Sequence, residues 1–104
     1  MDNYKFVSDL NAELGDIPVD SIISQTILKD GQKKVILFGF APGQELSEHT
    51  AAQPAMLHFM EGEADVTLGE DSMQAEAGAW AYMPANLPHS ILAKTKLVML
   101  LVMI

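Results

Sequence analysis

Cysteine is absent from this sequence of 104 residues, so disulfide bridges, thiolate metal sites and cysteine nucleophiles are all excluded. Arginine is absent too, and none of the six lysines lies between Lys34 and Lys94. Because nucleic-acid binding needs clustered Lys or Arg to neutralise phosphates, no nucleic-acid partner is expected. A strongly anionic substrate is disfavoured for the same reason, unless a bound metal ion supplies the positive charge.

Membrane and export signals are missing as well. The start of the chain shows no basic segment followed by an apolar run, and the apolar tail Leu97 to Ile104 is far shorter than a membrane span. The net charge is −8, and 49% hydrophobic with 19% charged residues is typical of a well-buried globular domain. We therefore expect one cytoplasmic domain without membrane contact, because a chain of this length is too short for two cores.

Residues 1–20 form a lead-in to this domain. The segment Ser8 to Leu14 favours one short helix with Ser8 as its N-cap and Gly15 as its stop, and Pro18 prevents its continuation. Residues 21–104 show a different pattern, short β-rich runs separated by Gly, Pro and Asp, which is typical of a single β-sandwich or barrel domain. The expected strands cover residues 21–28, 34–38, 56–60, 64–68, 73–76, 79–83, 90–93 and 97–104.

The final strand, Leu97 to Ile104, has no polar residue on either face. A strand that is apolar on both faces must be covered on both faces, and an uncovered apolar edge invites aggregation. One cover is the barrel interior, and the other is either the lead-in helix or a second subunit. We therefore expect a homodimer.

Two blocks carry most of the functional information. The first contains Gly43, then His49 six positions later, and is closed by Gly62; the second runs from Gly78 to His89. These blocks resemble the paired motifs of the cupin superfamily, and the similarity to small stand-alone bacterial cupins extends over residues 20–104. The resemblance implies an all-β fold, a double-stranded β-helix or jelly-roll barrel, which usually holds a metal ion between its sheets.

The resemblance is incomplete at the metal-binding positions. The first motif would place a second histidine at position 51 and a glutamate at position 55, and both are alanine here. In the second motif, Asn86 stands in place of a glycine and Ala93 in place of an asparagine. Asparagine tolerates the left-handed backbone conformation that a turn can require. Two of the four usual ligand positions, His49 and His89, therefore remain.

By this resemblance, His49 and His89 face the barrel interior as candidate ligands for one divalent metal ion, such as Zn, Fe, Ni or Mn. A catalytic zinc site normally has three protein ligands, so two histidines alone form a weak, open site. Alternatively, the two rings bond to each other, to backbone or to water. His58 would complete a triad, but if position 55 points inward, strand alternation turns His58 outward unless a β-bulge near Pro54 inverts it.

A ligand-binding role is the other candidate for this space. The small residues at positions 51 and 55 leave room beside His49 and His89, and barrels of this size often hold one small ligand. We expect Leu57 and Phe59 to line this space, and Tyr82 to donate its hydroxyl into it. The competing interpretation is a collapsed apolar core.

The sequence thus predicts a small cupin that binds a metal ion or a small neutral ligand in its barrel through His49 and His89. The alternative is a mononuclear metal-dependent enzyme of dioxygenase or isomerase type, in which the bound metal ion would polarise a substrate or activate oxygen. A purely structural partner protein is the third reading. Neither catalytic residues nor a particular reaction is indicated by the residues present.

Overall fold

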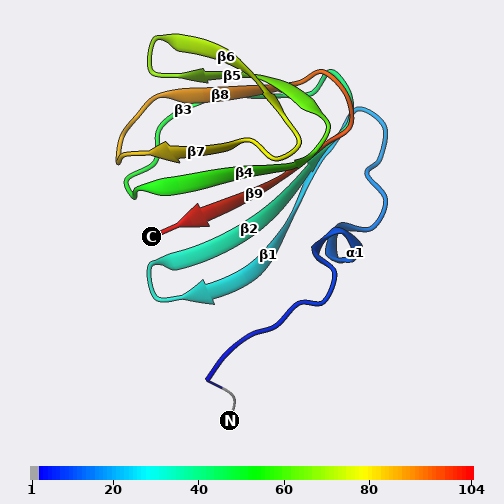
Figure 1. Ribbon diagram of the computed structural model, residues 1–104, viewed down its shortest axis with the longest axis vertical. Coiled ribbons are helices and arrows are strands. Elements are labelled where there is room, and N and C mark those ends of the chain that lie inside the picture. The colour runs from blue at the N-terminus through cyan, green and yellow to red at the C-terminus, as the bar shows by residue number, and fades with distance from the viewer. Residues whose placement is uncertain (1–2) are drawn as a thin grey trace.

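The computed structural model describes residues 3–104, which form two antiparallel β-sheets packed face to face (Figure 1). The five-stranded sheet has the order β1-β2-β9-β4-β7, and the four-stranded sheet has the order β3-β8-β5-β6. Successive strands such as β8 and β9 lie in different sheets, as in a jelly-roll barrel. The elements are α1 (Leu10–Leu14), β1 (Ile22–Asp30), β2 (Lys33–Phe40), β3 (Glu45–His49), β4 (Ala55–Glu61), β5 (Glu63–Leu68), β6 (Asp71–Glu76), β7 (Trp80–Met83), β8 (His89–Ala93) and β9 (Leu97–Met103).

Each expected strand is present, and the structure adds β3, which the sequence pattern did not show. The helix α1 begins at Leu10, later than expected. Ser8 as its N-cap was wrong, because the flanking residue is Asp9, whose extended backbone makes no side-chain capping bond. Gly15 ends the helix with a φ of 68°. Within residues 3–104, no helix is long and apolar enough to cross a membrane.

Four residues of the two sequence blocks occupy turns that require a left-handed backbone. Gly43, Gly62 and Gly78 have φ values of 84°, 90° and 97°, a region that favours glycine because it lacks a Cβ atom. Asn86, which stands where the cupin pattern has glycine, has a φ of 67°. The expectation that asparagine would accept this conformation is therefore confirmed, and the turn before β8 keeps its shape.

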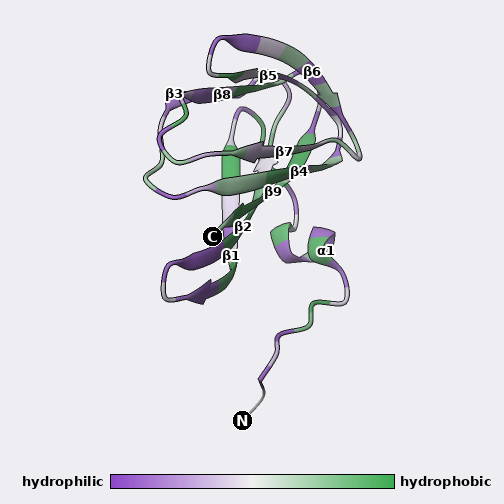
Figure 2. Ribbon diagram, turned by 60° about the vertical axis from the view of Figure 1, so that its left-hand side comes forward, coloured by the Kyte–Doolittle hydropathy of each residue, from purple (hydrophilic) through white to green (hydrophobic). Residues whose placement is uncertain are grey.

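The main core lies between the two sheets. On β4, Ala55, Leu57 and Phe59 are buried while His58 is exposed, which is the alternation expected for a strand with one face inward. On β9, Leu97 and Met99 point into the same core. Figure 2 shows the apolar colouring along β4 and β9, in contrast to the polar tip of the β1–β2 hairpin.

A second, smaller core covers part of the outer face of the five-stranded sheet. Ile27, Leu37 and Val98 are its buried members, and Leu10 and Leu14 of α1 pack against them. The lead-in helix therefore supplies one of the two covers that the apolar strand β9 requires. It leaves the portion of this face near β7 uncovered.

Candidate functional site

His49 and His89 are direct neighbours at one end of the barrel. His49 is the last residue of β3 and His89 the first of β8, and the two residues are paired in the antiparallel register of the four-stranded sheet. Their ring centroids lie 4.1 Å apart, with the ring planes tilted by 57°. His89 is only 6% exposed, whereas His49 lies exposed at the rim. The pair therefore extends from the wall of the barrel to its mouth.

Each imidazole is held by a backbone carbonyl two residues before it. Nδ1 of His49 lies 2.8 Å from the Ser47 carbonyl oxygen, and Nδ1 of His89 lies 2.9 Å from the Leu87 carbonyl oxygen. A carbonyl oxygen only accepts hydrogen bonds, so Nδ1 carries the hydrogen in both neutral rings. Neither Nε2 is engaged by a protein hydrogen bond within residues 3–104. Both Nε2 lone pairs are therefore available, which is the arrangement that carbonyl partners impose on metal-ligating histidines.

A cavity of about 220 Å³ opens beside the two rings. Ala51 and Ala55, the residues at the depleted motif positions, both border it, so the space that larger ligand side chains would fill is open. The remaining lining comes from β7, β9 and nearby turns. These residues are Gln53, Met83, Pro84, Leu87, Leu101 and Met103. The walls are mostly apolar, with the two imidazoles and one amide as polar groups.

Gln53 is the polar residue of this cavity that the sequence did not indicate; the apolar lining from Met83, Leu87, Leu101 and Met103 was not predicted either. Its amide nitrogen donates to the backbone carbonyl of Gln32 in the β1–β2 turn, which fixes the side chain and leaves its amide oxygen as an acceptor. The signal that would have found it is its place in the first block. Gln53 is a polar side chain between Ala51 and Ala55, both of which were expected to border the pocket.

Several of the other predicted site residues lie elsewhere. Leu57 and Phe59 point inward as expected, but they belong to the core between the sheets and do not border the cavity. His58 and Tyr82 lie on the opposite, outer face of the five-stranded sheet. His58 pairs with Trp80, and Tyr82 is half exposed and pairs with Met56. The alternation of short strand β7 places Ala81 and Met83 inward, so Tyr82 does not reach the space beside the histidines.

The metal-ligand chemistry of the site is limited to two imidazoles and neighbouring oxygens. Among residues 3–104, no group of three or more His, Cys, Asp or Glu side chains is placed to hold a metal ion. A metal ion at this mouth would therefore be held by the Nε2 atoms of His49 and His89, with water or an amide oxygen as further ligands.

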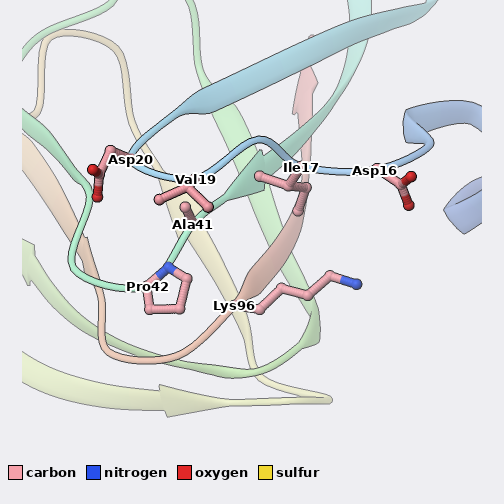
Figure 3. A pocket seen from close by; sticks show the side chains of 7 residues that line it. All are labelled: Asp16, Ile17, Val19, Asp20, Ala41, Pro42 and Lys96. Atoms are coloured by element: carbon pink, nitrogen blue, oxygen red, sulfur yellow. The ribbon is translucent and has the colours of Figure 1, made fainter.

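A second, wider cavity of about 610 Å³ lies at the other end of the barrel, where the lead-in meets the ends of β2 and the β8–β9 turn (Figure 3). Asp16 and Asp20 stand at its two sides, with Val19 and Ala41 between them. Lys96 borders it as well, and its ammonium pairs with Glu61 at 3.5 Å. None of the described residues that line this groove is a histidine.

The order of the strands in the two sheets assigns the chain to the class of small jelly-roll barrels. Two paired histidines lie at one mouth of this barrel. The cupin domain model matches residues 36–104, and the chain belongs to the cupin family. No curated protein sequence matches the chain.

The chain is similar in fold to several solved structures of bacterial proteins. A conserved protein of unknown function from Streptococcus pyogenes is similar at a TM-score of 0.86 and 28% identity, with 98% of this chain and 89% of that chain covered. A cupin superfamily protein from Desulfitobacterium hafniense is similar at a TM-score of 0.82 and 21% identity, covering 86% of this chain and 82% of the other. A cupin 2 conserved barrel domain protein from Leptotrichia buccalis is similar at a TM-score of 0.81 and 26% identity, with 89% of this chain and 45% of that chain covered.

Proposed function

We propose that this cupin is a binding protein whose barrel mouth takes one divalent metal ion on His49 and His89, together with a small neutral ligand in the adjoining cavity. The observation that carries the proposal is the pair of carbonyl-held rings, because both Nδ1 atoms are bonded to backbone and both Nε2 atoms are left for a ligand.

The donor set fits a borderline metal ion. Imidazole suits Zn, Fe and Ni, whereas Mn is better served by oxygen donors such as carbonyl groups and water. Gln53 borders the same cavity, and its amide oxygen is a candidate third ligand. A bound ion would supply Lewis acidity at the mouth. The chain's own residues would orient the two rings and leave the remaining coordination positions open, since Ala51 and Ala55 fill none of them.

The nature of the second ligand follows from the walls. No lysine or carboxylate is among the described residues that line the cavity, so no lysine or carboxylate side chain of the protein is placed there to pair with a charged group of the ligand. At about 220 Å³ the space is below the usual range for drug-sized ligands, which begins at about 300 Å³. We therefore expect a small, uncharged and partly apolar occupant.

A metal-dependent enzyme of dioxygenase or isomerase type is the second candidate. The observation in its favour is the open coordination sphere, because two protein ligands leave room for both a substrate and water. Turnover of a small neutral substrate by the zinc-, iron- or manganese-loaded protein, lost in His89→Gln, would favour this candidate over the binding protein.

We expect the two histidines to act as one unit in metal binding. Titration of the protein with Zn²⁺ by calorimetry should give one site per chain. His49→Gln and His89→Gln should each weaken it by at least about tenfold, which corresponds to about 1.4 kcal/mol. The double variant should be little worse than either single one, because removal of one ligand already breaks the pair.

His58→Gln is the matched control, since it removes the third imidazole from the opposite sheet face. It should leave Zn²⁺ affinity within about twofold, a difference of about 0.4 kcal/mol. Equal losses in His58→Gln and His89→Gln, or additive losses in the double variant, would contradict a site built on the 49–89 pair.

A further inference from the structure

The outer face of the five-stranded sheet has an uncovered half. Across β9, β4 and β7 the register aligns Val102 with Met56 and Tyr82, and Leu100 with His58 and Trp80. The lead-in helix packs over the other end of this face. What remains open is an apolar and aromatic surface, which we call the outer patch. It consists of Met56, His58, Trp80, Tyr82 and Val102.

The outer patch is exposed to an extent that is unusual for its residue types. Trp80 is 61% exposed and Tyr82 is 50% exposed, on adjacent positions of one strand face. Neighbouring large apolar side chains that stay open to water in a monomer commonly mark an interaction site. Trp and Tyr are also the residue types that dominate binding energy at protein interfaces.

Charge identifies the kind of partner. The chain has a net charge of −8, yet the stretches Ala55 to Met60, Trp80 to Met83 and Leu97 to Met103 contain no charged residue. Two copies of so acidic a chain repel each other over most of their surface. They can approach closely where acids are missing, and the outer patch is such a surface. A basic partner would find no carboxylate there to pair with.

The extended segment before α1 carries a complementary pair of aromatic side chains. Lys5 and Val7 line a groove against β1 and β2, whereas Tyr4 and Phe6, between and beside them, are 76% and 79% exposed. Figure 1 shows this segment, the N-terminal arm, running away from the barrel. Two aromatic side chains directed away from their own barrel are costly in water unless a second surface covers them.

We propose that a second copy of this chain packs on the outer patch in a two-fold symmetric homodimer, with the N-terminal arm of each copy contributing Tyr4 and Phe6 to the cover. Each aromatic side chain buries roughly 150–250 Å², so the four exposed ones alone supply roughly 500 Å² per copy at their present exposure. Met56 and Val102 add to this, which approaches the roughly 800 Å² per partner of a standard stable interface.

The same strands connect this interface to the histidine mouth. Ala55 and Met83 border the cavity on the inner face, and Met56 and Tyr82, their immediate neighbours in the chain, belong to the outer patch. A partner on the outer face would therefore hold in place the strand ends that form the cavity wall. This inference stands independently of whether a metal ion binds.

Trp80 is the only tryptophan in the chain, so its fluorescence reports directly on the patch. The wild-type protein should be a dimer by light scattering at tens of micromolar. On serial dilution its tryptophan emission should shift to longer wavelength as the indole becomes exposed. Tyr82→Glu should be monomeric at every concentration tested, with emission already at the long-wavelength limit, and Phe6→Ser should raise the dissociation constant by at least about tenfold.

Val19→Glu is the matched control, because Val19 is 85% exposed but lies at the opposite end of the barrel. It should remain dimeric with the wild-type dilution curve. A monomeric wild type at tens of micromolar would overturn the proposal, as would a dimer that Tyr82→Glu leaves intact or that Val19→Glu disrupts. Circular dichroism spectra that match wild type would show that each variant is folded.

Discussion

Gly62→Ala is expected to destabilise the fold by more than about 3 kcal/mol. Gly62 has a φ of 90°, a conformation that costs a non-glycine residue on the order of 1–3 kcal/mol. A Cβ atom at this position would also lie 1.9 Å from the carbonyl oxygen of Lys96. Because that atom belongs to the backbone of the β8–β9 turn, the clash can be relieved only by separating the turn from the β4–β5 connection.

Gly78→Ala isolates the contribution of this clash. Gly78 has a similar φ of 97°, but a Cβ atom there would meet nothing within 4 Å. Urea denaturation of both variants should show a loss of about 1–3 kcal/mol for Gly78→Ala, from backbone strain alone, and a clearly larger loss for Gly62→Ala. Equal losses would mean that the close approach to Lys96 has no energetic consequence, contrary to this expectation.

Met99→Ala should produce the second large loss, about 2–5 kcal/mol, as measured for buried methionine truncations. Met99 lies on β9, which is paired with β2 and β4, and its side chain is 1% exposed in the core between the sheets. The total stability of a domain of this size is about 5–15 kcal/mol, so the change removes a large part of it.

The matched control is Met73→Ala on β6, where the methionine is 41% exposed. It should change the unfolding free energy by no more than about 0.5 kcal/mol. Both variants must be compared with wild type at one protein concentration, because association of the proposed kind makes apparent stability concentration-dependent. A loss for Met73→Ala as large as that for Met99→Ala would place the core elsewhere.

Short β-rich runs separated by turn residues predicted a β-sandwich or barrel, and the resemblance of the two blocks to the cupin motifs predicted the jelly roll. Asparagine was expected to accept a left-handed backbone at position 86, and the structure has a positive φ there. The alternation of β4 could be predicted once position 55 was assigned inward, and His58 accordingly lies outside. Strand β3 was not predicted, because its residues are mostly polar and show no β-rich pattern.

The candidate site was harder to predict because its shape depends on depth within the barrel. Alternation gives the face on which Leu57 and Phe59 lie, but not how far along the barrel the cavity extends, and both residues lie in the core instead. Tyr82 lies on a strand of only four residues, and nothing in its sequence indicated which of the two faces points inward. Gln53 reaches the cavity through a loop, whose course no periodic pattern specifies.

Histidine nitrogen NMR would test the binding site most directly, because the proposed site requires the hydrogen on Nδ1 and a free Nε2 in both rings. In the metal-free protein, long-range proton–nitrogen spectra of the neutral rings should show the hydrogen on Nδ1 and none on Nε2 in His49 and His89. Addition of Zn²⁺ should then move both Nε2 resonances together and leave those of His58 in place. The proposed site would be contradicted by a hydrogen on Nε2 of the neutral rings in the metal-free protein. A zinc response that includes His58 but omits His49 would also contradict it.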